Sequence, residues 1–258
     1  PEFATIQKIA NELHFPIRFF LENDLVNFAE SPTYFRSLLT TGKRYRREQE
    51  SKLLVVKIIY EYLGEYLKFK PINLPDISIN DDIEDAALRL RECWGLGLKP
   101  IDNLVYIAES NGLVVSDFES TTGDVDAYSH RIKTEKSNTF LIGYSRNKNT
   151  AARVHFDLAH ELGHILLHNW NEDLENIEKE EFKQIEQEAH NFASSFLLPK
   201  EAFIADIGNY AGNLAYYVEM KKRWKVSIAA MIRRSYNLKL ISSDDYQRLM
   251  RNMQKQGI

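Results

Sequence analysis

The residues that could carry out chemistry are concentrated in one short stretch, His160-Glu161-Leu162-Gly163-His164. Residues four apart lie on the same face of an α-helix, so the imidazoles of His160 and His164 could bind one metal ion. Zinc held in this way lowers the pKa of its bound water to about 7, and the neighbouring Glu161 could accept the proton of that water without binding the ion. This HExxH pattern therefore predicts a metal-dependent hydrolytic centre.

The motif lies in a segment that reads as a buried helix. Its apolar positions are Phe156, Leu158, Ala159, Leu162, Ile165, Leu166 and Leu167. Such a distribution is typical of a core helix in a folded domain. Two histidines and a glutamate in a buried helix cost free energy unless a ligand satisfies them, so we interpret the motif as a metal site.

A zinc site of this kind needs a third protein ligand from another element and leaves a fourth position for water. A second core helix is expected over residues 186–198. It offers three candidate ligands, namely Glu186, Glu188 and His190. We favour Glu188 because it shares a helical face with Phe192 and Ser195 and follows His164 by 24 residues.

Further polar side chains are candidates for roles around the ion. His168 lies eight residues after His160, and about 12 Å of helix between them is too far for both to bind one ion comfortably. We therefore expect His168 to support the site from the end of the helix. His155, Tyr128 and Tyr144 are, with His168, the candidates for stabilising the transition state.

Composition limits the class of protein. The chain has 258 residues, of which 44% are hydrophobic, which is enough for one large or two modest domains. The net charge of −4 gives no overall attraction to nucleic acid, and the single cysteine, Cys93, excludes an internal disulfide. The sequence has neither a secretory pattern nor an apolar run of about 18 or more residues, so we expect a cytoplasmic protein without a membrane segment.

The order of the expected elements predicts an α+β fold that is mainly helical, with a small β-sheet beside the HExxH helix and an N-terminal helical region. Helical spacing dominates residues 5–66, and a proline-rich connector follows at 69–76. Two helices are expected within 82–109, with Pro100 in the first turn of the second. Short strands are expected at 113–116, 125–129 and 139–144.

Three segments carry a resemblance to a known family. They are residues 153–168 with the HExxH motif, Glu188-Ala189-His190-Asn191-Phe192-Ala193, and Leu197-Leu198-Pro199. Together they resemble the ImmA/IrrE family of metallo-endopeptidases, over roughly residues 80 to 250. The resemblance implies a gluzincin-like peptidase that uses zinc (Zn2+), with His160, His164 and Glu188 as ligands and Glu161 as general base. Manganese (Mn2+) would be compatible with the same ligand set. The resemblance also implies a protein substrate, a helix-turn-helix repressor cleaved in a stress or mobile-element (prophage) switch.

A second resemblance concerns the N-terminus. Residues 5–20 resemble the last part of an XRE-type helix-turn-helix domain whose remainder would lie upstream, although a plain helical extension packed on the peptidase is the alternative. Within the segment 226–236, Arg233 and Arg234 could reach DNA phosphates, whereas the apolar spacing also suits a helix that only packs in the core. The competing functional hypothesis is therefore a DNA-binding regulator or antitoxin whose peptidase-like domain senses or docks without proteolysis.

These expectations divide the chain into four parts. Residues 1–3 resemble a cloning scar, and residues 4–70 form an N-terminal helical region. The peptidase domain is expected at 71–210, and a C-terminal helical, helix-turn-helix-like subdomain at 211–258.

Overall fold

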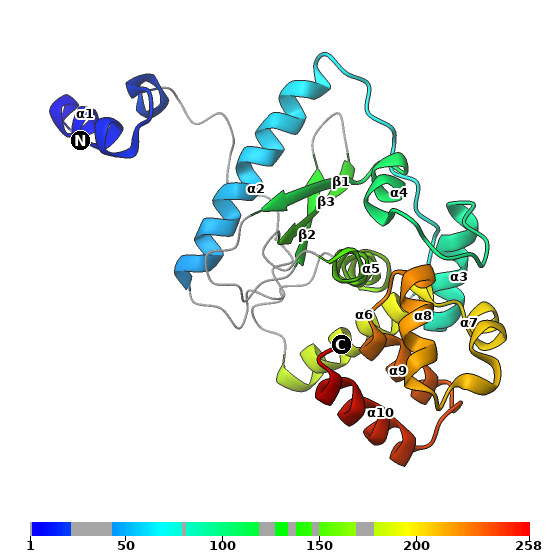
Figure 1. The fold of residues 1–258 in the computed structure, drawn as a ribbon. Coiled ribbons are helices and arrows are strands. Elements are labelled where there is room, and N and C mark those ends of the chain that lie inside the picture. The colour runs from blue at the N-terminus through cyan, green and yellow to red at the C-terminus, as the bar shows by residue number, and fades with distance from the viewer. Residues whose placement is uncertain are drawn as a thin grey trace.

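A small mixed sheet lies at the centre of the fold (Figure 1). Strand β1 (Val114–Phe118) runs parallel to β3 (Asn138–Ser145), and β2 (Ala127–Lys133) runs antiparallel to β3. The strand order is β1-β3-β2, so β2 is an edge of the described sheet. In the β2–β3 register, Ser129 lies opposite Ile142 and Ala127 lies opposite Tyr144.

The computed structural model describes residues 2–21, 43–78, 81–118, 127–133, 138–145, 150–168 and 178–258. The helices before the sheet are α1 (Phe3–Leu13), η1 (Ile17–Phe20), α2 (Lys43–Gly64), α3 (Ile83–Cys93) and α4 (Leu104–Ser110). The helices after it are α5 (Ala151–Leu167), α6 (Lys179–Leu197), α7 (Lys200–Ile207), η4 (Gly208–Tyr210), α8 (Leu214–Trp224), α9 (Ile228–Asn237) and α10 (Ser243–Gln256). Among the described residues, no helix combines the length and apolar character needed to cross a bilayer.

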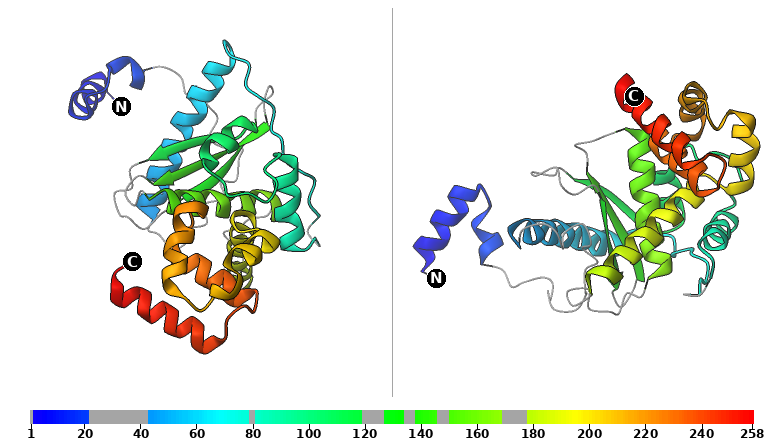
Figure 2. Two further views of the ribbon diagram at one scale, coloured as in Figure 1. Left: turned by 45° about the vertical axis from the view of Figure 1, so that its right-hand side comes forward. Right: turned by 90° about the horizontal axis from the view of Figure 1, so that it is seen from below.

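The sheet is covered on both faces (Figures 1 and 2). Helix α2 packs on one face, where Leu53 and Tyr60 join a buried cluster with side chains of all three strands. Helix α5 packs against β2 and β3 on the other face. Successive side chains of a strand point to opposite faces, so each strand residue faces either α2 or α5.

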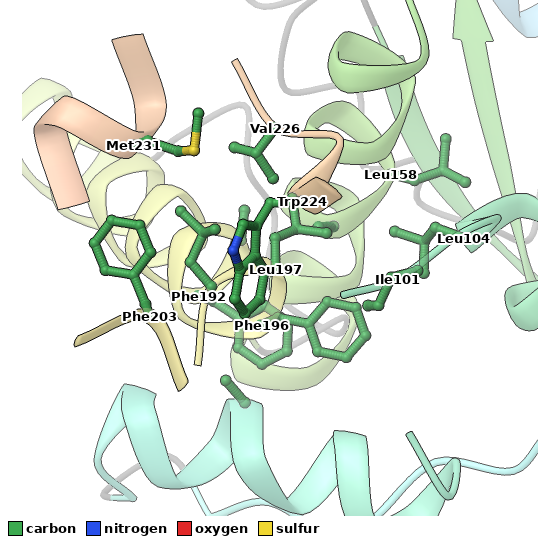
Figure 3. Packing of buried hydrophobic residues seen from close by; sticks show 14 of the residues in the cluster. Ile101, Leu104, Leu158, Phe192, Phe196, Leu197, Phe203, Trp224, Val226 and Met231 are labelled. Carbon is green, nitrogen blue, oxygen red and sulfur yellow. The ribbon is translucent and has the colours of Figure 1, made fainter. Parts of the chain in front are cut away.

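The larger core lies on the α5 side of the sheet and joins α3 to α10 (Figure 3). Phe192, Phe196 and Leu197 of α6 are fully or almost fully buried in it. Trp224 and Met231, which come from the C-terminal helices, pack into the same cluster. The C-terminal helices therefore share one core with the helix that carries the HExxH motif.

Helices α5 and α6 are held close together by a small residue. Thr150 caps α5, because its side-chain oxygen accepts a hydrogen bond from the backbone N–H of Arg153. Gly163, in the middle of the motif, faces α6, and a Cβ at this position would lie 3.1 Å from the Cα of Ala189. The absence of a side chain at Gly163 thus allows the backbone of α6 to approach the HExxH segment.

The α+β prediction is confirmed, and one detail of the helical prediction is wrong. Pro100 does not open the second helix: α4 begins at Leu104, because the side chain of Asn103 caps it by accepting from the backbone N–H of Tyr106. Gly112 follows α4 with φ +84°, in the left-handed region that favours glycine. Residues 125 and 126 of the second expected strand lie outside the described residues.

The boundary expected at 69–76 falls on a segment that forms neither helix nor strand, since the chain from Leu67 to Ser78 is extended or irregular. Helix α2 precedes that segment in the chain, yet it packs on the sheet, whose strands follow the segment. Helix α1 lies apart from α2 and the sheet (Figures 1 and 2). Its first residue is Phe3, within the expected cloning scar. The division into domains stays a prediction.

Candidate metal centre

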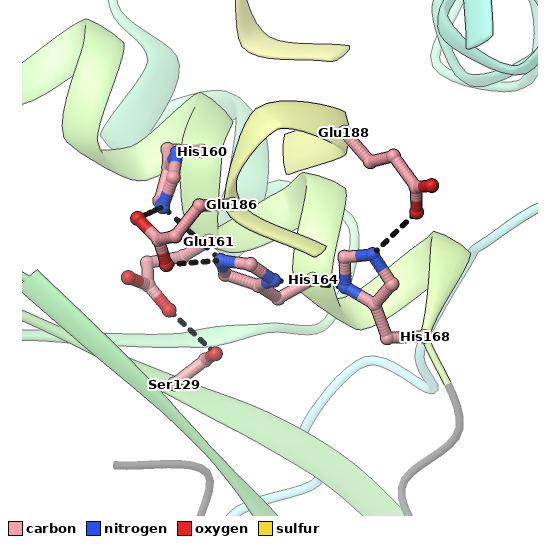
Figure 4. Close-up of polar contacts among 7 residues, drawn as sticks. All are labelled: Ser129, His160, Glu161, His164, His168, Glu186 and Glu188. Carbon is pink, nitrogen blue, oxygen red and sulfur yellow. Dashed lines mark hydrogen bonds and ion pairs between the residues drawn. The ribbon is translucent and has the colours of Figure 1, made fainter. Parts of the chain in front are cut away.

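Three potential metal ligands converge at the junction of α5 and α6 (Figure 4). The Nε2 atoms of His160 and His164 lie 3.1 Å apart. A carboxylate oxygen of Glu186 lies 3.6 Å from Nε2 of His160, and the other lies 3.8 Å from Nε2 of His164. One potential ligand atom from each of the three residues lies within 4.8 Å of the other two.

These distances are compatible with a single ion. A tetrahedral site with bonds of about 2.1 Å separates its ligand atoms by roughly 3.4 Å. The observed separations of 3.1, 3.6 and 3.8 Å lie around that value. Two imidazole nitrogens and one carboxylate also form a donor set that zinc accepts, with room for a fourth ligand. The residues present therefore fit a divalent metal ion.

The carboxylate in this group belongs to Glu186, whereas the sequence favoured Glu188. The face of α6 that contacts α5 is set by Ala189, which lies against Gly163. Glu186 lies three residues before Ala189 and thus on the same side of the helix, directed towards the two histidines. Glu188 is rotated away from this face, towards the end of α5, where its carboxylate lies 3.2 Å from Nε2 of His168.

Glu161 lies beside the two histidines and is held by the sheet. Its side chain is 6% exposed, and Oε2 accepts a hydrogen bond of 2.6 Å from the hydroxyl of Ser129. Ser129 is 1% exposed and projects from β2 towards α5 (Figure 4). The contact therefore fixes the orientation of the carboxylate from a second, rigid element. Ser129 could not be predicted from the sequence, because a single serine in a short strand carries no signal of its own.

His168 ends α5 and lies on the far side of His164 from Glu186 (Figure 4). Its Nδ1 lies 2.9 Å from Nδ1 of His164. It is not a member of the His160–His164–Glu186 group, in agreement with the spacing argument that separated it from His160. The contacts link Glu188, His168 and His164 in a row.

The other transition-state candidates do not join this group. Nε2 of His155 accepts a hydrogen bond of 3.4 Å from the backbone N–H of Leu104, beneath α4. Burial is the main cause that lowers the pKa of His155, and the charge of Lys225 acts in the same direction. The ring of Tyr128 lies over Gly143 in the cluster on the α2 face. Tyr144 packs against the larger core.

The two arginines proposed as DNA contacts have different environments. Arg234 is 3% exposed, and its guanidinium binds the carboxylate of Glu84, the hydroxyl of Ser195 and the carbonyl of Leu198. This burial corrects the expectation that Arg234 reaches phosphates. Arg233 is exposed, and its guanidinium carbon lies 5.8 Å from the ring centre of Tyr236 and 5.7 Å from that of Tyr246.

A groove of about 870 Å³ opens in front of the metal-binding group. His160, Glu161 and Glu186 form part of its wall, and His190 lies beside them with its ring centre 5.2 Å from that of His160. The groove continues to Arg233 on α9 and to Tyr246 and Met250 on α10, and Ala127 of β2 also lines it. A chain segment lying there could contact His160, Glu161, Glu186 and Arg233 together.

Comparison with known protein families shows which family this chain belongs to. The family model of the IrrE N-terminal-like domain, a peptidase family, matches residues 108–236, which is half of the chain. The chain belongs to this IrrE N-terminal-like peptidase family. No curated protein matches the chain.

Membership of the IrrE N-terminal-like family supports a metallopeptidase-type function and a metal cofactor. The matched region contains the whole His160–His164–Glu186 group together with Glu161 and Ser129. It begins in α4 and ends in α9. The groove extends beyond the match, because Tyr246 and Met250 of α10 also line it.

Proposed function

We propose that this protein is a zinc-dependent endopeptidase in which His160, His164 and Glu186 hold the ion and Glu161 is the general base. The observation that carries the proposal is the convergence of the two Nε2 atoms and the Glu186 carboxylate within 4.8 Å, with His160 and Glu186 in the wall of the groove. When bound, the ion supplies Lewis acidity, which polarises a carbonyl group and lowers the pKa of water to about 7.

The chain's own groups then handle the proton. Glu161 accepts a proton from the attacking water and donates it to the amine of the leaving product. Ser129 keeps the Glu161 carboxylate in one orientation through the 2.6 Å hydrogen bond to Oε2. Because general acid–base transfer depends on the position of the carboxylate, a fixed orientation increases the rate of both proton transfers.

The substrate is proposed to bind as an extended peptide. Ala127 at the start of β2 lines the groove, and β2 is an edge of the described sheet. An extended segment can add to a sheet as a further strand through its backbone N–H and C=O groups. The substrate would therefore have to expose a loop or an unfolded segment.

The proposed biological substrate is a regulatory protein of the helix-turn-helix repressor class, whose cleavage switches a stress response or a mobile element. This part of the proposal relies on the family resemblance alone. The alternative, a DNA-binding regulator without proteolysis, gains no support from α9. Arg234 is buried, and Arg233 lines the peptide groove.

The test uses purified protein loaded with zinc and a peptide library prepared by digesting a bacterial protein extract. New N-termini, identified by mass spectrometry, are expected with the wild type and are expected to disappear with Glu161→Gln, which keeps the proposed ligands. Co-expression with candidate repressors, scored for the loss of the intact repressor, then identifies the substrate. Equal sets of new N-termini from wild type and Glu161→Gln would contradict the proposal.

A further inference from the structure

Behind the proposed metal ligands runs a row of hydrogen-bonded side chains that the reaction itself does not use. Nδ1 of His164 lies 2.9 Å from Nδ1 of His168, and Nε2 of His168 lies 3.2 Å from Oε2 of Glu188. The other oxygen of Glu188 accepts a hydrogen bond of 2.9 Å from the side-chain amide of Gln184 (Figure 4 shows the first three residues). Both histidine side chains are almost fully buried, at 1% and 6% exposure.

The backbone explains how His168 can meet His164 so closely. His168 is the C-cap of α5, with φ −113° and ψ 151°, so the chain leaves the helical path at this residue. Its ring therefore lies alongside the ring of His164, with centres 5.0 Å apart. Glu188 reaches the same ring from α6. The row thus connects the end of α5 to α6 on the side of His164 opposite Glu186.

The positions of the hydrogens follow from this geometry. An imidazole that binds a metal through Nε2 carries its hydrogen on Nδ1, so His164 must donate to His168. Nδ1 of His168 is then the acceptor, and the hydrogen of a neutral ring is on Nε2. That atom faces an oxygen of Glu188, and a carboxylate accepts. One arrangement of hydrogens therefore satisfies both contacts at once.

We propose that His168 and Glu188 are positioning residues that fix the ring orientation and tautomer of the metal ligand His164. The inference rests on the proposed metal site. A hydrogen-bond acceptor behind a ligating histidine makes the ligand more basic and restricts its rotation, and its removal typically weakens metal binding by about 10–100-fold. Burial of the two histidines strengthens the hydrogen bond between them, because water competes poorly for hydrogen bonds in a low-dielectric interior.

The first experiment measures zinc affinity by competition with a chromogenic chelator, using the full chain. Glu188→Ala and His168→Ala are expected to weaken binding by about 10–100-fold. His168→Asn, whose amide oxygen can accept from His164, and Glu188→Gln, which still offers an acceptor, are expected to lose less than the alanine variants. Glu181→Gln, an exposed glutamate on the same helix, is the matched control and should bind zinc like the wild type.

The outcomes separate this inference from the proposed function. Equal zinc affinity of wild type, Glu188→Ala and His168→Ala would overturn the positioning role and leave the proposed metal site intact. A wild-type protein that binds no zinc would overturn both.

A second measurement needs no variant and is therefore independent of any folding defect. Long-range ¹H–¹⁵N spectra of the zinc-loaded wild type report the tautomer of each histidine. We expect His164 to carry its hydrogen on Nδ1. We expect His168 to carry its hydrogen on Nε2, with Nδ1 unprotonated. The opposite tautomer of His168 would overturn the inference.

Discussion

The Cα atom of Ala189 on α6 lies 3.1 Å from the position that a Cβ would occupy on Gly163 of α5. Two atoms of the Phe192 side chain lie 3.2 Å from the same point. This close approach sets how near Glu186, one turn before Ala189, comes to the two histidines of the motif. The glycine inside the HExxH sequence therefore helps to set the geometry of the proposed metal site, although its own atoms are not proposed ligands.

Gly163→Val is expected to destabilise the fold by about 1–3 kcal/mol, because the added atoms overpack the contact between α5 and α6. The same displacement moves the Glu186 carboxylate, so zinc affinity should fall as well. In Gly163→Ala the smaller clash is partly offset by a gain in helix propensity of up to ~1 kcal/mol, which makes this variant the milder control. Denaturant unfolding and chelator competition measure the two effects, and wild-type values for Gly163→Val in both would refute the argument.

Ser129→Ala is expected to slow peptide hydrolysis without weakening zinc binding, because Ser129 contacts Glu161 and none of the proposed ligands. We expect kcat to fall by roughly 10-fold, less than the ~10²–10⁴-fold that a general acid–base group contributes. Ser129→Thr keeps a hydroxyl donor and should recover part of the rate. A Ser129→Ala protein with unchanged kcat, or with weakened zinc binding, would show that the serine has another role.

Stability should decrease on mild acidification because of His130, a buried residue of β2 on the α2 face. Burial, followed by the positive charge of Lys57, lowers its pKa from 6.5 to about 4. Below pH 6.5 the unfolded chain takes up a proton that the folded chain does not, so the free energy of unfolding falls as the pH drops towards 4. The expected loss from this residue is roughly 2–3 kcal/mol.

Urea unfolding of chelator-treated protein between pH 7 and pH 4 measures this loss, since removing metal excludes a contribution from its release. His130→Leu should flatten the pH dependence, whereas His14→Leu, at an exposed position of the N-terminal region, should not. The same pH dependence in wild type and His130→Leu would show that the acid sensitivity arises elsewhere.

Arg233 is expected to contribute to substrate binding rather than to chemistry. It lines the groove together with His160 and Glu186, while its guanidinium lies near the rings of Tyr236 and Tyr246. Arg233→Ala should therefore raise KM several-fold for peptides that it contacts and leave kcat at saturation nearly unchanged. Arg251→Ala, an exposed arginine on α10, is the control, and a fall in kcat alone for Arg233→Ala would contradict the assignment.

Much of the fold could be predicted from the sequence, because its signals are local. The apolar spacing around His160 predicts a buried helix, and α5 is buried along the face that carries Leu158 and Leu162. Serine is a residue type that commonly caps helices, and the side chain of Ser227 accepts a hydrogen bond from the backbone N–H of Ala230 at the start of α9. The start of the second helix was predicted wrongly at Pro100, because proline is compatible with the first turn of a helix but does not require one. The helix begins instead at Leu104, after the cap formed by Asn103.

The sequence predicts that the third proposed ligand lies on α6, but it does not identify which residue of that helix it is. Glu186 and Glu188 are only two positions apart, and the choice depends on which face of α6 meets α5. That face is set by the long-range contact between Gly163 and Ala189, which helical periodicity does not reveal. Ser129 was unpredictable for a similar reason, since its role depends on how β2 packs against α5.

The most direct measurement is a crystal structure of the zinc-loaded protein with an anomalous difference map recorded at the zinc absorption edge. We predict one strong peak between Nε2 of His160, Nε2 of His164 and the carboxylate of Glu186. The carboxylate of Glu188 should remain hydrogen-bonded to Nε2 of His168. A peak coordinated by Glu188 instead of Glu186, or no peak between the two motif histidines, would contradict the metal centre proposed for this chain.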